Sequence, residues 1–336
     1  MTPQEFMQKQ SLPYEAKVVH AELRAREFYD KAIELGKNVH ISVGGLDSIT
    51  LLLFLKSIGI DAHPVSVSSL EDKSIRAVHK ILGVESITPY RNMSEVVREF
   101  GYPVISKEKA GKIQLLQNPT DKNKTVRNAI MTGDCGEQGG FRKGTRMKLP
   151  KKWLELFAGP ENENHGTNYK TAPFAVSNKC CHYMKEKPCE DWAKKHTSVP
   201  YLGLMASEGG QREKALQQHG CNYWGKTTTR SAPFAIFSRQ DLLRLAVELK
   251  VPVPAIYGEI VEENGILRTT GAQRTGCVMC GFGIHIEKRP HRFDRTRESN
   301  YKEWHYWMYD MGWGGVLDYI GVKWEDVCDD CFEKGI

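Results

Sequence analysis

The sequence lacks any long hydrophobic run. Its longest uncharged apolar stretch, Ile49 to Leu55, is much shorter than the roughly 18 residues of a membrane span. The opening residues, MTPQEFMQKQ, contain no apolar core of a secretion signal, and no segment repeats at a fixed period or has low complexity. We therefore expect a cytoplasmic protein that does not contact a membrane and is neither a solenoid nor a repeat array.

A strong excess of one charge is also missing. Lys and Arg number 47 and Asp and Glu 41, which gives a net charge of +6 over 336 residues. The hydrophobic share of 40% and the charged share of 26% fit a globular chain with one large or two modest domains. Cysteine is abundant, and nine cysteines in a reducing compartment are not expected to form structural disulfides, so they need another explanation.

The first part of the chain alternates between predicted helices and strands. Residues 14–35 predict an amphipathic helix with Val19 and Leu23 on its apolar face. Residues 39–43 predict a strand that leads through a glycine turn into a helix ending near Ile58.

The same order then repeats. Residues 62–67 and 84–87 predict strands, and between them residues 72–82 predict a helix with Ile75, Val78 and Ile81 on one face. This alternation predicts an α/β fold, with a parallel sheet and helices on both faces. Ligands of such sheets bind at the carboxyl ends of the strands.

Three regions are expected along the chain. They are an N-terminal helical segment (1–35), a nucleotide-binding and cysteine-bearing domain (36–285) and an aromatic C-terminal subdomain (286–336).

Within the middle region, the alternating pattern of helices and strands becomes weaker at about residues 108–178. This stretch predicts a loop-rich insertion with one helix near 153–157, and its basic part, 141–152, fits either a solvated face or an anion-binding surface. Regular structure returns at 238–249, which predicts a helix with Ser238 as its N-cap.

Glycines and small polar residues follow the first predicted strand, in ISVGGLDS (41–48). Gly44 and Gly45 let the backbone approach a ligand without a Cβ in the way, and Asp47 and Ser48 open the next helix. The unpaired amides of a helix N-terminus form an anion site suited to phosphate. The Walker and G-x-G-x-x-G spacings are both absent. A turn that only reverses the chain is the alternative.

The segment ISVGGLDS resembles the S-G-G-x-D-S pyrophosphate loop of the adenine nucleotide alpha-hydrolase superfamily, which includes ATP pyrophosphatases, sulfurylases and sulfonucleotide reductases. Val43 stands where that motif usually has its first Ser, which implies the loss of one hydroxyl contact to a triphosphate. The resemblance implies a nucleotide-binding set of Ser42, Gly44, Gly45, Asp47 and Ser48.

Four cysteines form two close pairs, Cys180 with Cys181 and Cys277 with Cys280. Four thiolates from two pairs can enclose zinc or an iron–sulfur cluster, and buried thiols without a metal are a third interpretation. Adjacent cysteines rarely point at one zinc ion, so the first pair favours a cluster.

Adjacent cysteines followed far downstream by Cys-x2-Cys resemble the 4Fe-4S site of adenylylsulfate reductases, which belong to the phosphoadenosine phosphosulfate (PAPS) reductase family. The resemblance extends over about residues 36–285 in the order of that family. The matching segments are KCCHYMKEKP (179–188), GLMASEGGQR (203–212, with Met205 in place of an Arg), SAPFAIFSRQDL (231–242) and RTGCVMC (274–280).

This resemblance implies an enzyme that binds an adenine nucleotide (ATP, adenylylsulfate or PAPS) beside a 4Fe-4S cluster, with Mg²⁺ as a further candidate cofactor. A thiolate attacks the sulfur of the sulfonucleotide, and a thioredoxin-like reductant then releases sulfite. Basic residues beside the matched motifs are candidates for binding the sulfate or phosphate groups of the nucleotide. They are Lys107, Lys179, Arg212, Arg230 and Arg274.

Cys328 and Cys331, in the C-terminal CDDC, are the candidate catalytic thiols. The family carries its nucleophile within E-C-G-L-H, which is absent here, and the acidic neighbours Asp329 and Asp330 would raise a thiol pKa. A redox or sulfur-carrying pair, a zinc half-site and a plain tail therefore remain open.

Two other functions remain open as well. One is an ATP-dependent sulfurtransferase that thiolates tRNA or DNA, which the absent tail motif and the basic insertion favour and Val43 disfavours. The other is a nucleotide-binding protein without catalysis. A homodimer is a candidate assembly, and the sequence leaves the oligomeric state open.

The remaining cysteines and the C-terminal tryptophans are expected to pack in the core. Stacking on nucleic-acid bases is the alternative for the tryptophans. These residues are Cys135, Cys189, Cys221, Trp304, Trp307, Trp313 and Trp324.

Overall fold

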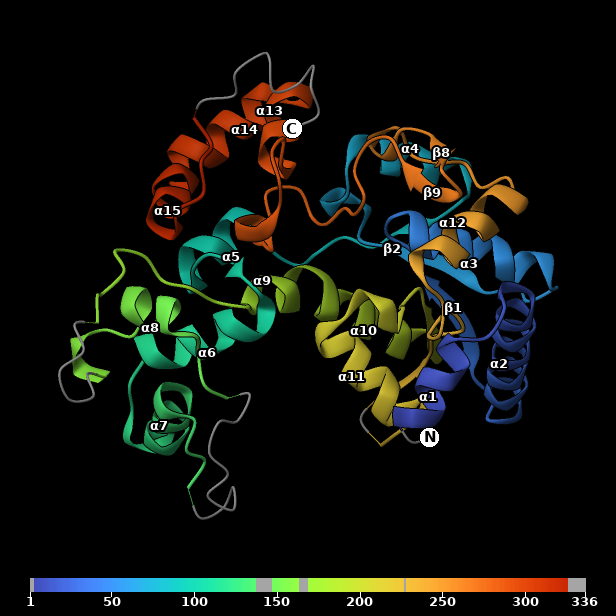
Figure 1. The fold of residues 1–336 in the computed structure, drawn as a ribbon, viewed down its shortest axis with the longest axis horizontal. Helices are drawn as coiled ribbons and strands as arrows, with labels where there is room; N and C mark the ends of the chain where they lie inside the picture. Colours follow the sequence, from blue (N-terminus) through green and yellow to red (C-terminus); the bar gives the residue numbers. More distant parts are fainter. Residues whose placement is uncertain (1–2, 137–146, 163–168, 227, 326–336) are drawn as a thin grey trace. The chain divides into compact units, whose positions relative to one another are not determined.

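The chain forms two compact units, each built from two separate segments. The computed structural model describes residues 3–136, 147–162, 169–226 and 228–325 (Figure 1). The first unit combines Met1–Pro89 with Lys187–Cys277, and the second combines Tyr90–Glu186 with Val278–Ile336. The expected regions 1–35, 36–285 and 286–336 remain a prediction. In the described ranges, no helix is long and apolar enough to cross a membrane.

A six-stranded sheet in the order β3-β2-β1-β5-β7-β6 organises the first unit. All neighbouring strands are parallel except β6, which runs antiparallel to β7. The strands are β1 Asn38–Ser42, β2 His63–Ser66, β3 Glu85–Ser86, β5 Ser198–Leu202, β6 Asn222–Trp224 and β7 Thr229–Ser231, with a separate hairpin of β8 Ile260–Glu263 and β9 Ile266–Thr269. The predicted α/β class with a mainly parallel central sheet is confirmed.

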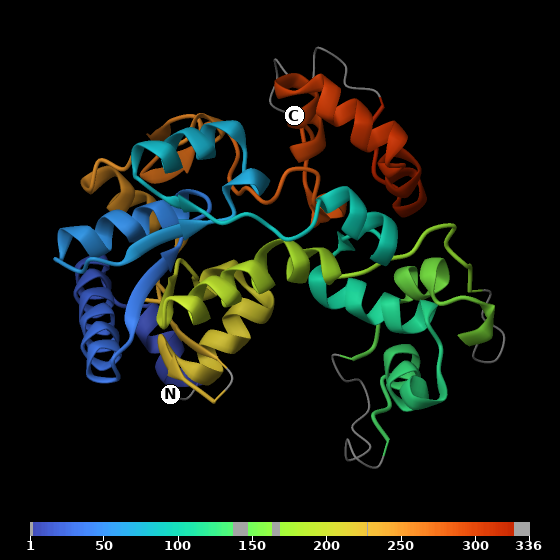
Figure 2. The ribbon, with the colours of Figure 1, turned by 180° about the vertical axis from the view of Figure 1, so that it is seen from behind.

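Helices pack on both faces of this sheet (Figures 1 and 2). On one face the Tyr201 hydroxyl donates to the carbonyl oxygen of Ala25 in α2, at 2.6 Å. Neighbouring strand residues point to opposite faces, and on the other face the His40 ring contacts Trp192 of α10, with centroids 5.2 Å apart. The helices of this unit are α1 Pro3–Gln10, α2 Tyr14–Glu34, α3 Leu46–Ser57, η1 Ser68–Leu70, α4 Lys73–Ile81, α10 Lys187–Lys195, η6 Ala206–Glu208, α11 Gly210–His219, α12 Arg239–Glu248 and η7 Ala255–Tyr257.

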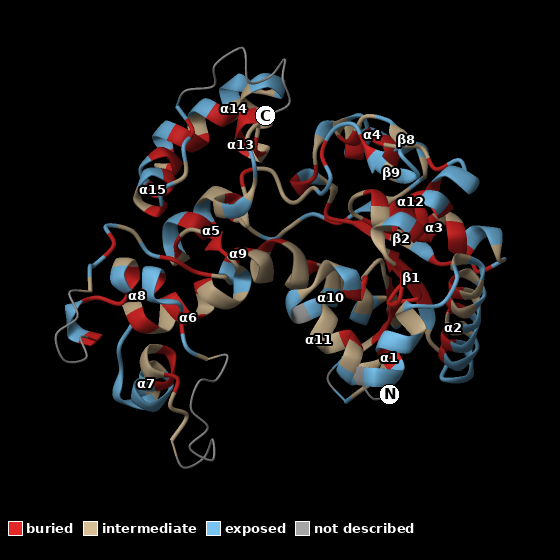
Figure 3. Cartoon of the chain, in the orientation of Figure 1, coloured by how far each residue is buried: buried red, intermediate tan, exposed pale blue. Residues whose placement is uncertain are grey.

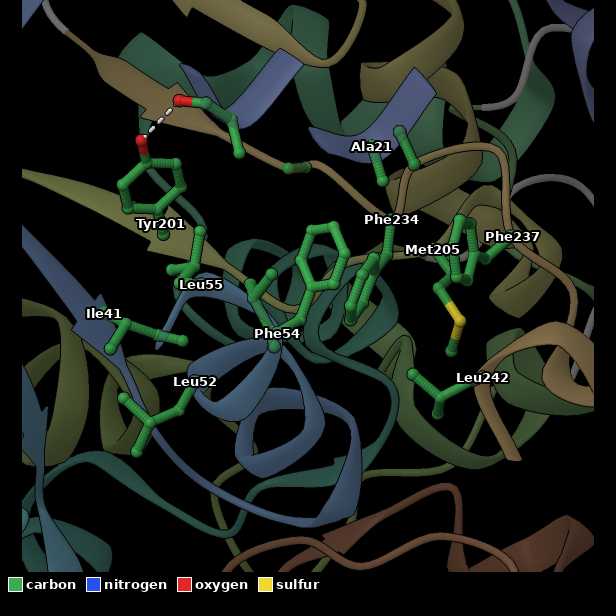
Figure 4. Packing of buried hydrophobic residues seen from close by; sticks show 14 of the residues in the cluster. Ala21, Ile41, Leu52, Phe54, Leu55, Tyr201, Met205, Phe234, Phe237 and Leu242 are labelled. Carbon is green, nitrogen blue, oxygen red and sulfur yellow. Dashed lines mark hydrogen bonds between the residues drawn. The ribbon is translucent and has the colours of Figure 1, made fainter. Parts of the chain in front are cut away.

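The helix predicted over 14–35 is present as α2, but its predicted apolar face was wrong. Val19 and Leu23 are 66% and 50% exposed, whereas Ala21, Ala25 and Phe28 are fully buried. Alanines let a helix backbone lie close to the sheet, so the small residues mark the buried face here. Ala21 lies in the core shown in Figure 4, together with Tyr201, Phe54 and Leu55.

Two other predicted helices of the first unit are present. In α4, Ile75 and Val78 are buried as expected, whereas Ile81, in the last turn, is 76% exposed, so that part of the prediction was wrong. Ser238 caps α12 by accepting from the amide of Asp241, as predicted. Buried residues are concentrated along β1 and α3 (Figure 3).

The strand order places the glycine turn at a special position in the sheet. From β1 the chain moves to β2 and β3 on one side, and it later returns to place β5 on the other side of β1. The direction of winding therefore changes between β1 and β5. Ligands of open parallel sheets bind in the crevice that forms outside the strand ends at such a switch point.

The second unit is mainly helical, with a two-stranded parallel sheet of β4 Val104–Ile105 and β10 Gly281–Phe282. One hydrophobic cluster joins residues from 97 to 176 with residues from 279 to 324. Trp304, Trp307, Trp313 and Trp324 are all buried in it, which confirms the core prediction for these side chains. The helices are α5 Met93–Phe100, α6 Lys107–Gln117, η2 Asp121–Asn123, α7 Lys124–Thr132, α8 Lys151–Phe157, η4 Pro160–Asn162, α9 Lys179–Cys181, η5 His182–Glu186, η8 Ile284–Ile286, α13 Arg292–Ser299, α14 Tyr301–His305, η9 Tyr306–Asp310 and α15 Trp313–Ile320.

The prediction of one helix within 108–178 was wrong. The helix near 153–157 is present as α8, but α6 and α7 come before it. Ser106 caps α6 by accepting from the amide of Lys109, and Ala110, Ile113 and Leu116 form its buried face. Interspersed Lys, Gln and Gly residues conceal this apolar spacing in the sequence.

Candidate functional site

The glycine turn joins β1 to α3 at the switch point of the sheet. Val43 continues the sheet, since its amide donates to the carbonyl oxygen of Val65 at 2.8 Å, and its side chain is buried. Gly45 is the N-cap residue of α3 and supplies no side-chain cap. The valine that replaces the serine of the motif thus belongs to the core.

Ser48 closes the turn from inside the helix. Its Oγ accepts from the amide of Gly44 at 2.7 Å and donates to the carbonyl oxygen of Gly45 at 2.9 Å. Among the described residues, the amides of Gly45 and Asp47 have no hydrogen-bond acceptor. Two N–H groups at the start of a helix are therefore available to an anion, and the helix dipole favours negative charge there.

Two buried side chains that sequence reasoning missed, His79 of α4 and Tyr257 of η7, form hydrogen bonds with the backbone of the turn. His79 Nε2 lies 2.8 Å from the carbonyl oxygen of Gly44, so it carries the proton, and Nδ1 accepts from Ser68 Oγ at 3.1 Å. The amide of Leu46 donates to Tyr257 Oη at 3.1 Å. Burial raises the pKa of Tyr257, which keeps its hydroxyl protonated.

Close packing explains why two positions at this site are glycine. A Cβ on Gly45 would lie 2.8 Å from Thr275 Oγ1 and closer still to Tyr257 Oη. Gly203 follows β5, and a Cβ there would lie 3.0 Å from both the backbone N and the Cα of Ser48. The chain after β5 therefore lies against the start of α3 at Gly203, whereas Gly45 makes room for Tyr257 and Thr275, and GLMASEGGQR was the sequence signal for Gly203.

An ion pair borders the turn. Arg239, the first residue of α12, contacts Asp47 Oδ1 through Nη1 at 2.5 Å and donates from Nη2 to the carbonyl oxygen of Gln273 at 3.1 Å. Burial raises the pKa of Asp47, and the charge of Arg239 partly offsets that rise. Sequence reasoning missed Arg239, although it lies inside SAPFAIFSRQDL (231–242), one of the segments on which the family resemblance was based.

A second carboxylate, that of Glu208, forms ion pairs with two of the predicted arginines. The side chain of Glu208, in η6 directly after β5, is only 6% exposed and pairs with Arg212 and Arg274. Glu208 and Arg274 also lie close enough to Asp47 to affect its pKa. These groups form a charged cluster of three arginines and two carboxylates, which we call the arginine cluster: Asp47, Glu208, Arg212, Arg239 and Arg274.

The other predicted basic residues lie elsewhere. Arg230, on β7, is 8% exposed and donates from Nη2 to the carbonyl oxygen of Ala215 in α11 at 3.3 Å. Burial lowers its pKa. Lys107 pairs with Glu186, and Lys179 opens α9, so both belong to the second unit. Arg212 and Arg274 are thus the two predicted cations that join the arginine cluster.

The predicted cluster ligands divide between the units. Cys180 is buried and Cys181 half-buried in α9, and they share the second unit with Cys280, whereas Cys277 is the last residue of the first unit. In the parts of the chain that are described, no three His, Cys, Asp or Glu side chains are arranged to hold a metal ion. The 4Fe-4S centre with these four cysteines as its ligands therefore stays a prediction, as does Mg²⁺.

The remaining predicted cysteines have different outcomes. Cys221 is buried in the core of the first unit, as predicted, whereas Cys135 and Cys189 are only half-buried. Cys328 and Cys331, the candidate catalytic thiols, lie outside the described residues, as does the 141–146 part of the basic stretch.

The arrangement as a whole can hold an anionic group. It offers open amides at a helix start, arginines beside them and glycines that keep the approach clear of side chains, all at the switch point of a parallel sheet. No family model, no curated protein and no solved structure matches this chain.

Proposed function

We propose that this chain is an adenine-nucleotide-binding enzyme of sulfur metabolism, a sulfonucleotide reductase of the PAPS reductase type. The observation that carries the proposal is the pair of open amides, Gly45 and Asp47, at the start of α3, at the switch point between β1 and β5. A phosphate placed there would accept from both amides and face the helix dipole. The finer fold assignment, to the adenine nucleotide alpha-hydrolase type, belongs to the same proposal.

The arginine cluster supports an anion larger than a single phosphate. Arg212 and Arg274 hold Glu208 but keep about half of their side-chain surface exposed, at 50% and 58%. Each guanidinium therefore has donors to spare for a second phosphate or a sulfate. A nucleotide with two linked acidic groups matches this supply of donors better than a nucleoside does.

The proposed reaction transfers a sulfonate group to a thiol. A cysteine thiolate attacks the sulfur of the bound sulfonucleotide, and the bond from sulfur to the phosphate oxygen breaks. AMP, or its 3′-phosphorylated form, leaves with the bonding electrons. A dithiol of the thioredoxin class then attacks the sulfonated cysteine, releases sulfite and becomes a disulfide. The amides at the start of α3 would stabilise the negative charge that develops on the departing phosphate.

An anaerobic turnover assay tests this proposal. The purified chain is offered adenylylsulfate or PAPS with reduced thioredoxin, and sulfite is measured. In parallel it is offered ATP with tRNA or DNA, and AMP and pyrophosphate are measured. Sulfite release supports the proposal, nucleic-acid-dependent pyrophosphate release replaces it with the sulfurtransferase, and nucleotide binding without turnover leaves a binding protein.

A matched pair of variants links turnover to the site. Arg274→Gln removes a member of the arginine cluster and should weaken nucleotide binding. Arg268→Gln removes an arginine of the same region that pairs with Glu263 in the β8–β9 hairpin, and it should leave binding unchanged. Equal effects of the two substitutions would contradict this placement of the nucleotide.

A further inference from the structure

The backbone of Arg239 is fixed at the start of α12, and its inner guanidinium nitrogen, Nε, is an unused donor. Ser238 caps α12 through Asp241, and Asp241 is paired with the buried Lys17 at 2.8 Å, which fixes where Arg239 begins. Its two terminal nitrogens contact Asp47 and Gln273. Within the described part of the chain, Nε is buried without any hydrogen-bond partner. A buried donor without an acceptor is costly, so this N–H calls for an acceptor that a ligand would bring.

The carboxylate of Asp47 creates an electrostatic problem for an anionic ligand. It lies in the first turn of α3, next to the open amides that would receive a phosphate. An uncompensated carboxylate there would repel the phosphate. Arg239 supplies the compensating charge, with its Nη1 2.5 Å from Asp47 Oδ1.

We propose that Arg239 selects nucleotides by their second acidic group: it neutralises Asp47 in the ligand-free chain and donates its Nε–H to a phosphate or sulfate oxygen in the complex. This inference rests on the proposed function and deepens it, because it names the ligand class as nucleotides with a phosphoanhydride or phosphosulfate. Adenosine has no acidic group and AMP has only one, so adenosine would bind entirely without this contact and AMP largely without it. The arginine acts as a specificity-determining residue.

Arg244 provides a control on the same helix. It pairs with Glu15 and Glu248 and lies over the ring of Tyr14. Arg244 is therefore an arginine of the same helix that forms ion pairs with carboxylates, as Arg239 does, but its partners are not part of the glycine turn. A general effect of removing one positive charge from α12 would appear in both variants. An effect of the site would appear only in Arg239→Gln.

The experiment is calorimetric titration of the full chain and its variants with adenosine, AMP, ADP and adenylylsulfate. The two anionic ligands ADP and adenylylsulfate distinguish a second phosphate from a sulfate. Arg239→Gln should weaken both by roughly 10- to 100-fold, because a charge-assisted hydrogen bond is lost, while adenosine changes less than about twofold. Arg239→Lys, which keeps the charge but lacks Nε–H, should fall between, and Arg244→Gln should match the natural chain.

A pH series separates this role from a merely structural one. In Arg239→Gln the carboxylate of Asp47 loses its paired cation and keeps Glu208 and Arg274 as charged neighbours, so affinity for ADP should recover as pH falls and the carboxylate gains a proton. Adding Asp47→Asn to Arg239→Gln should produce the same recovery at neutral pH.

Each outcome is decisive. If Arg239→Gln weakens all four ligands equally, or none, the inference is overturned while the proposed function stands. If the natural chain binds none of them, the proposed function fails and the inference fails with it. If Arg239→Gln does not fold, Arg239→Lys decides, and ADP binding equal to that of the natural chain would overturn the inference.

Discussion

Gly45 lies so close to Tyr257 that an alanine at this position must displace the tyrosine. The backbone of Gly45 is extended, with φ −80° and ψ −163°, so alanine fits its conformation and only the contact matters. The new Cβ would meet Tyr257 Oη well inside van der Waals contact and Thr275 Oγ1 at 2.8 Å. Moving the tyrosine also breaks the bonds of its hydroxyl to the amide of Leu46 and to Thr275.

The cost follows from these two contributions. Overpacking a buried site costs about 1–3 kcal/mol, and each of the two lost hydrogen bonds adds about 1 kcal/mol, so Gly45→Ala should destabilise the chain by about 3–5 kcal/mol. Adding Tyr257→Phe removes the nearer of the two clashing oxygens, leaves the ring carbon Cζ at 3.4 Å, an ordinary contact, and keeps Thr275 Oγ1 at 2.8 Å. The double variant should therefore be more stable than the sum of the single variants predicts, by about 1–2 kcal/mol.

Urea unfolding followed by fluorescence and circular dichroism measures all three variants. Gly315→Ala is the control, because Gly315 is exposed within α15, and a Cβ there would meet no atom within 4 Å. That substitution should be neutral or stabilise the chain by up to about 1 kcal/mol. Two results would refute the close packing of the turn. One is that Gly45→Ala unfolds at the same urea concentration as the natural chain, and the other is that the stability loss of the double variant equals the sum of the losses of the two single variants.

Three further predictions concern acid stability, thiol reactivity and iron. Burial, with smaller contributions from two neighbouring histidines, lowers the pKa of His40 to about 4, so the unfolded chain binds more protons between pH 6.5 and 4. Stability should fall by about 3 kcal/mol as pH drops through that window, and His40→Gln should flatten this part of a urea-unfolding pH series. Burial raises the pKa of Cys221 to about 11, so mass spectrometry should find its peptide unalkylated at pH 8 in the native chain and alkylated after unfolding, and rapid native labelling would contradict its burial. Anaerobically purified chain should contain iron and sulfide that Cys277→Ser or Cys280→Ser abolishes and Cys221→Ser retains, and colourless, iron-free protein would exclude the cluster.

The sequence predicted the local elements around the turn well. The strand at 39–43, the helix ending near Ile58 and the Ser238 cap depend on glycines, apolar runs and capping residues that are adjacent in the chain. The buried face of α2 was missed, because Val19 and Leu23 are the most apolar residues there, while the sheet accepts the alanines. Local patterns show that a helix forms, but its orientation depends on what it packs against.

The candidate site was predicted in part for the same reason. Gly44, Gly45 and Ser48 form a continuous motif, so their role in the turn was visible in the sequence. Tyr257 and Arg239 are far from it along the chain and reach it because the sheet order brings the ends of α12 and η7 to the same edge. No spacing rule within one sequence connects such residues.

The position of β5 beside β1 has a consequence for synthesis on the ribosome. β3 ends at Ser86 and β5 begins at Ser198, so the whole intervening segment is made before β1 gains its second neighbour. At about 5–20 residues per second, this central strand would keep an open edge for roughly 5–20 s. Such an edge can pair with a strand of another nascent chain, so this interval is when aggregation threatens the protein most and when a chaperone would help it most.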